Sequence, residues 1–89
     1  MAHPEHGKSR IWYVVAPVQG GWQVTFGVAA SPFVYPTRGE AEVIARGAAK
    51  LHWDNRQEPA GARLDLADGS RHVLATFGRV AHAETRRAG

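Results

Sequence analysis

The residues of this chain that could carry chemistry are five histidines and an aspartate that a hairpin places beside one of them. A turn at Asp68-Gly69 makes Asp65 and His72 cross-strand partners, the arrangement of an acid–base pair. Nucleophilic catalysis also needs a hydroxyl within hydrogen-bond reach, and Thr76 lies four residues beyond His72 on the same strand, which is too far. The pair indicates a sheet-stabilising contact, so we expect no enzymatic activity and no catalytic residues.

The other four histidines lack the spacing of a metal site. One falls at the end of the expected helix and three lie near the chain ends: His52, His3, His6 and His82. No two histidines have the helical or hairpin spacing of a ligand set, and no nearby carboxylate completes one. The sequence therefore predicts neither a metal ion nor another cofactor.

The distribution of charge limits the classes of partner. The formal net charge of the 89 residues is +3, but residues 11–78 carry six basic and six acidic side chains, so the excess lies in the ends. A domain that binds phosphates usually gathers Lys and Arg on one face. The chain has no cysteine and no apolar run near the roughly 20 residues of a membrane helix. We expect a cytoplasmic protein with no membrane partner.

Two hairpins are expected to carry these side chains. Residues 11–18 and 22–28 are predicted strands on either side of the glycine pair at positions 20 and 21. Residues 62–67 and 70–77 are predicted strands around the Asp-Gly turn at positions 68 and 69. The first strand is apolar on both faces, which favours a central position in the sheet.

One helix is expected between the hairpins. Thr37 and Glu40 have the spacing of a capping box, which predicts a helix from residue 38 to about residue 53. Residues 29–36 contain two prolines and are expected to be an irregular connection, and residues 54–61 a loop. A narrow apolar stripe on the helix should face the sheet: Ala41, Ile44, Ala48 and Leu51.

These elements predict an α+β fold of order β-β-α-β-β, with one helix packed on one face of a four-stranded, mainly antiparallel sheet. Strand order 2-1-3-4 fits the apolar pattern, and 2-1-4-3 fits it as well. A single domain at residues 10–78 would lie between a disordered leader at residues 1–9 and a flexible basic tail at residues 79–89.

Strand register then decides which side chains lie away from the helix. A two-residue turn at Gly20-Gly21 directs Tyr13, Val15 and Pro17 toward the helix and Trp12 away from it. A three-residue loop at residues 19–21 would bury Trp12 instead. With the first register, the uncovered face is the candidate binding site, formed by seven residues: Trp12, Val14, Gln23, Thr25, Arg63, His72 and Leu74.

Short motifs along residues 11–78 support this order of elements. They are Tyr13-Val14-Val15 with Pro17, Gly20-Gly21-Trp22-Gln23-Val24, Thr37 with Glu40-Ala41, Asp68-Gly69 and Phe77-Gly78. In this pattern the chain resembles DUF2188, a family of small prokaryotic domains of unknown function. The chain departs from the family where Ala16 interrupts the strand motif and Tyr13 replaces the usual His. The resemblance implies a compact α+β domain and supplies no catalytic residues.

The uncovered face leads to two functional expectations. The first is a non-catalytic binding or assembly module that forms a homodimer through this face or through a sheet edge, because an apolar sheet face seeks cover. The alternative is a weak single-stranded DNA or RNA binder that stacks bases on Trp12. Neither needs a membrane or a small-molecule cofactor.

Overall fold

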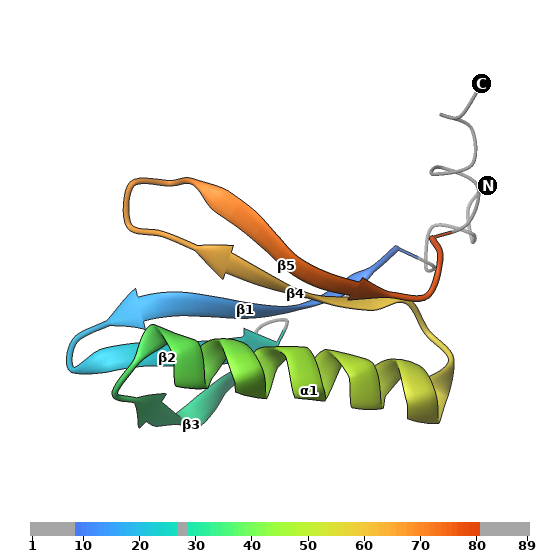
Figure 1. Ribbon diagram of the computed structural model, residues 1–89, viewed down its shortest axis with the longest axis horizontal. Coiled ribbons are helices and arrows are strands. Elements are labelled where there is room, and N and C mark those ends of the chain that lie inside the picture. Colours follow the sequence, from blue (N-terminus) through green and yellow to red (C-terminus); the bar gives the residue numbers. More distant parts are fainter. Residues whose placement is uncertain (1–8, 27–28, 81–89) are drawn as a thin grey trace.

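One helix lies across a five-stranded sheet (Figure 1). The computed structural model describes residues 9–26 and 29–80. The elements are β1 Ile11–Val18, β2 Gly21–Phe26, β3 Ala29–Tyr35, α1 Arg38–Arg56, β4 Ala60–Asp65 and β5 Arg71–Phe77. The leader expected at residues 1–9 and the basic tail expected at 79–89 lie outside the described residues, except for residues 9, 79 and 80.

The sheet order is β3-β2-β1-β4-β5. The four expected strands therefore follow the predicted order 2-1-3-4, and the α+β class is confirmed. Pairing is antiparallel except between β1 and β4, which run parallel. The parallel pair arises because α1 carries the chain back along the sheet before β4 begins.

The prediction of an irregular segment at residues 29–36 was wrong, because residues 29–35 form the edge strand β3. Two prolines suggested a break in regular structure. An edge strand needs hydrogen-bond donors on one side only, so Pro32 is tolerated within it, and Pro36 follows its last residue. The sheet therefore has five strands in place of the four expected.

The first hairpin has the predicted faces. Val18 pairs with Gly21, so the two-residue loop is Gln19-Gly20, one position earlier than expected. Gly20 has a φ of +92°, which its missing side chain permits. The displacement by one position on each side preserves which residues share a face, and Val15 pairs with Val24 in the core. The alternative that would bury Trp12 is excluded by this register.

The second hairpin differs from the prediction because its loop has three residues. Leu66 N donates to Ser70 O at 2.9 Å and Gly69 N donates to Leu66 O at 3.0 Å, which closes a turn over residues 67–69. Gly69 takes a φ of +92°, typical of a turn that ends in a left-handed residue. The extra loop residue moves the register of β5 by one position next to the turn.

A β-bulge restores the register further along β5. Arg63 pairs with Val73 but Ala62 pairs with Ala75, so Leu74 is the extra residue. Beyond the bulge, β5 keeps the predicted pairing. Before it, the prediction was wrong: Val73 lies on the side of Arg63, away from the helix, and Asp65 pairs with Arg71 where His72 was expected.

The helix begins as predicted and packs differently. The Thr37 hydroxyl accepts from Glu40 N at 3.2 Å, and α1 then continues to residue 56, three residues beyond the expected end. Its buried stripe is Ala41, Ala45 and Ala49. Of the expected stripe, Ala41 is buried as predicted, whereas the prediction was wrong for Ile44 and Leu51, which are 44% and 59% exposed. Alanines at intervals of four let the helix lie close to the sheet, where Val15 is fully buried.

Candidate binding surface

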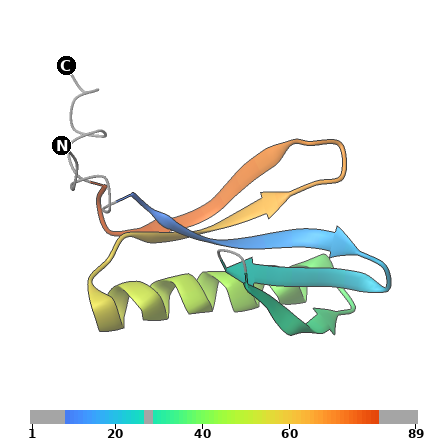
Figure 2. The same ribbon diagram turned by 180° about the vertical axis from the view of Figure 1, so that it is seen from behind.

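The face of the sheet opposite α1 is covered by no other element of residues 9–26 and 29–80 (Figure 2). We call it the open face. All five strands contribute to it, and the register gives its members: Trp12, Val14, Ala16, Gln23, Thr25, Val34, Gly61, Arg63, Asp65, Arg71, Val73 and Thr76.

The structure brings five of the seven predicted site residues together on this face: Trp12, Val14, Gln23, Thr25 and Arg63. The other two lie elsewhere. Leu74, the bulge residue, packs against the hydrophobic core. His72 pairs with Leu64, a core residue, and its Nε2 lies 3.2 Å from the Ser70 hydroxyl. The three-residue loop explains both displacements, and Val73, 62% exposed, takes their place on the open face.

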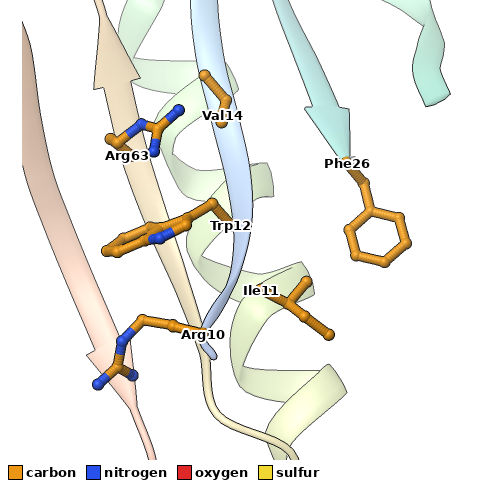
Figure 3. A pocket seen from close by; sticks show the side chains of 6 residues that line it. All are labelled: Arg10, Ile11, Trp12, Val14, Phe26 and Arg63. Carbon is orange, nitrogen blue, oxygen red and sulfur yellow. The ribbon is translucent and has the colours of Figure 1, made fainter. Parts of the chain in front are cut away.

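Trp12 is the largest side chain of the open face and lies near one end of the middle strand, β1. A Cβ on Gly61, its partner in the parallel pair, would lie 2.6 Å from Trp12 Cζ3, so the indole edge rests directly on the β4 backbone. The guanidinium carbons of Arg63 and Arg10 lie 5.5 Å and 6.0 Å from its ring centroid. Figure 3 shows the indole between these two arginines. Cation–π contacts of this kind hold an aromatic ring in one orientation.

Both flanking arginines bind acceptors of their own chain. Arg63 donates from Nε and Nη2 to the two Asp65 carboxylate oxygens, at 2.8 Å and 3.2 Å. Arg71 Nε lies 3.7 Å from the same carboxylate. Arg10 Nη1 lies 3.1 Å from two carbonyl oxygens, those of Ala60 and Phe77, and 3.3 Å from that of Gly78. The arginine–tryptophan cluster is therefore preorganised by hydrogen bonds.

A shallow groove of about 380 Å³ opens beside Trp12 at the rim of this face. The last paired residues of β1 and β2 are Tyr13 and Phe26, so Ile11 and Trp12 extend past the end of β2. The groove lies along this extension, and Figure 3 shows Trp12 and Phe26 on opposite sides of β1. Its lining is apolar except for two arginines: Arg10, Ile11, Trp12, Val14, Phe26 and Arg63.

A second polar cluster lies on the helix side of the sheet, and sequence reasoning missed it. The Tyr13 hydroxyl lies 3.2 Å from His52 Nδ1, and His52 Nε2 lies 2.9 Å from the Glu58 carboxylate. The His52 side chain is only 8% exposed. Phe26 stacks on Tyr13 with ring centroids 4.7 Å apart. Only the short interval between His52 and Glu58 was visible in the sequence, because Tyr13 comes from a distant strand.

This cluster has the order hydroxyl, imidazole, carboxylate that nucleophilic enzymes use. Burial raises the pKa of Tyr13, and the nearby charge of Arg56 opposes this only in part. A raised pKa keeps the phenol protonated, which is the opposite of nucleophile activation. The geometry fits a contact that joins β1 to the end of α1.

Two further observations concern the described part of the chain. No three His, Asp or Glu side chains within it gather in a way that could hold a metal ion. Its helix is not long and apolar enough to cross a membrane.

No protein-family model matches the chain, and no curated protein or solved structure matches it. The resemblance to the DUF2188 family remains a prediction from short motifs.

Proposed function

We propose that this protein is a non-catalytic assembly module that forms a homodimer through its open face. The observation that carries the proposal is the sheet itself, which is packed by α1 on one side and presents an apolar band on the other. Its side chains come from three of the five strands: Val34 on β3, Trp12, Val14 and Ala16 on β1, and Val73 on β5. Val34 and Val73 are 44% and 62% exposed. A twofold contact between such faces would bury the band.

The edges of the sheet are less suited to pairing between copies. Pro32 removes a backbone donor from β3, and the register of β2 with β3 shifts between Gln23 and Thr25. The other edge strand, β5, contains the bulge at Leu74 and begins with Arg71. Prolines, bulges and charges are the means by which edge strands avoid pairing with other chains. The open face is therefore the favoured interface.

Single-stranded nucleic acid is the second candidate, and charge favours it. Among the described residues, the open face and its rim carry three arginines, Arg10, Arg63 and Arg71, and one acidic residue, Asp65, so phosphate would be attracted. Base stacking on Trp12 is less favoured, because a guanidinium group lies on either side of the indole (Figure 3). Displacing Arg63 from the ring would also strain its two hydrogen bonds to Asp65.

Val73→Lys distinguishes the two candidates, because it should weaken dimer formation and strengthen the binding of nucleic acid. Val73 is 62% exposed on the open face, so the folded monomer tolerates the change while a dimer would bury the new charge. In light scattering after size exclusion, we expect the wild-type protein to have the mass of a dimer and the Val73→Lys variant to have the mass of a monomer. Val43→Lys is the matched control, because Val43 is 65% exposed on the outer side of α1.

Salt and an oligonucleotide complete the test. Apolar association holds or strengthens from about 50 to 500 mM salt, whereas phosphate binding falls steeply. A monomeric wild-type protein under both conditions contradicts the assembly proposal. Binding of a mixed-sequence single-stranded oligonucleotide that Val73→Lys strengthens and salt abolishes would replace it with the nucleic-acid function.

A further inference from the structure

The groove beside Trp12 has a lining that assembly does not require. It lies at the rim of the open face, where β1 extends past β2, and it continues to Ile11 and Phe26 on the helix side of the strand. Its volume of about 380 Å³ is within the range of small-molecule sites. A site of this size needs a ligand of matching polarity.

The charges of the lining are of one sign. Arg10 and Arg63 line the groove, and none of the described residues that line it is acidic. Asp65 neutralises part of the charge of Arg63, but its carboxylate contacts only Nε and Nη2 of the guanidinium group. Nη1 of Arg63 has no hydrogen-bond partner among the described residues, so a ligand anion would find a donor there without breaking the ion pair. The groove is therefore positively charged beside Arg63 and can bind an anionic group there.

The remainder of the lining is apolar. Ile11, Trp12, Val14 and Phe26 supply two aromatic and two aliphatic side chains. Phe26 is 39% exposed although it is held by its stack on Tyr13, so a flat apolar surface is available and fixed in place. Aromatic walls of this kind favour a planar partner.

We propose that the groove binds a small aromatic carboxylate, with the carboxylate on Arg63 and the ring on the apolar lining where β1 extends past β2. This inference rests on the lining of the groove and does not require the homodimer. A second copy seated on the open face would compete for Trp12, so carboxylate binding is expected to favour the monomer.

A matched pair of probes tests the proposal on the full chain. Naphthalene-2-carboxylate and the neutral naphthalene-2-carboxamide have nearly the same shape, and only the first carries a charge. In an amide and indole NMR titration, we expect the carboxylate to shift Trp12 and Phe26 resonances with a Kd below about 1 mM. The carboxamide is expected to bind about tenfold more weakly, because it loses the charge-assisted hydrogen bond.

Two variants locate the charge. Arg63→Gln is expected to remove the preference for the carboxylate, whereas Arg71→Gln should leave it within about twofold, because Arg71 contacts Asp65 but does not line the groove. Equal binding of the two probes, or shifts that map outside the groove, would overturn the proposal. If Arg63→Gln fails to fold, the probe pair and the shift map on the wild-type protein still decide. The oligomeric state is measured on the same samples, so this proposal and the homodimer can fail separately.

Discussion

The Tyr13 hydroxyl on β1 lies 3.2 Å from Nδ1 of His52 near the end of α1, across 39 positions of sequence. Nε2 of the same imidazole lies 2.9 Å from Glu58, in the loop that leads to β4. An ionised carboxylate only accepts hydrogen bonds, so in the tautomer with the proton on Nε2 the ring donates to Glu58 and Nδ1 accepts from the Tyr13 hydroxyl. One buried ring therefore joins a strand, the helix and a loop.

Removing either partner of His52 should destabilise the fold. Tyr13→Phe leaves Nδ1 without its donor and is expected to lower the free energy of unfolding by about 1 kcal/mol. Tyr35→Phe is the control, because Tyr35 packs on the core and its hydroxyl has no hydrogen bond among the described residues. Urea unfolding measures both.

The two contacts of His52 should also be coupled. Combining Tyr13→Phe with Glu58→Ala is expected to cost less than the two changes separately, by roughly 0.5 kcal/mol, since each partner helps to orient the ring that the other binds. Glu58→Gln retains an acceptor and should restore most of the loss. Strict additivity in the double-mutant cycle would show that the contacts act independently.

Alkaline pH should release the same contact. Burial raises the pKa of Tyr13, and the charge of Arg56 lowers it to a smaller extent. The folded protein thus prefers the neutral phenol, so its contribution to stability is complete below the usual tyrosine pKa of about 10 and is lost as pH rises through the higher folded value. Phenolate absorbance against pH measures this, and Arg56→Gln should move the Tyr13 transition to still higher pH.

Acid should act on the second hairpin through Asp68. The Ser70 hydroxyl and backbone N–H donate to its carboxylate at 2.7 Å and 2.9 Å, and both bonds lower the pKa of Asp68. A lowered pKa in the folded state means that this stabilisation is present above the usual aspartate pKa and disappears as pH falls through the folded value. Carboxyl NMR should show an upward movement of the Asp68 pKa in Ser70→Ala and little change in Ser70→Thr.

Local signals in the sequence predicted local structure well. Thr37 caps the helix as expected by accepting from Glu40 N, and the glycines at positions 20 and 21 gave the correct faces of β1 and β2. Both features depend on residues within a few positions of each other. Trp12 and Arg63 were placed correctly on the open face because register passes from strand to strand.

The errors came from features that local patterns do not contain. A three-residue loop and the bulge at Leu74 compensate each other, so hydrophobic alternation alone gave the right register for half of β5 and the wrong one near the turn. The helix was assigned the wrong face because Ile44 and Leu51 are larger than the alanines that pack on the sheet. The helix packs close to the sheet through its small alanines, and its larger apolar side chains remain exposed. The contact of Tyr13 with His52 could not be predicted without the tertiary fold, because the two residues are 39 positions apart in the sequence.

The Trp12 indole packs against the β4 backbone at Gly61. A Cβ at Gly61 would lie 2.6 Å from Trp12 Cζ3 and 3.0 Å from the backbone oxygen of Ala75. The indole can move outward, but only by leaving the position between Arg10 and Arg63, and the β5 backbone cannot give way easily. We therefore expect Gly61→Ala to lower the free energy of unfolding by about 1–3 kcal/mol and to change the Trp12 indole resonance.

Gly47→Ala is the same type of substitution as Gly61→Ala, but it is expected to stabilise the protein. A Cβ there meets nothing within 4 Å, because Gly47 lies on the outer side of α1. Alanine has the higher helix propensity, so the free energy of unfolding should rise by roughly 0.5–1 kcal/mol. If Gly61→Ala stabilised the protein as Gly47→Ala is expected to do, Trp12 would not be held against β4. The open face would then lack the rigid aromatic centre on which both the homodimer and the carboxylate groove depend.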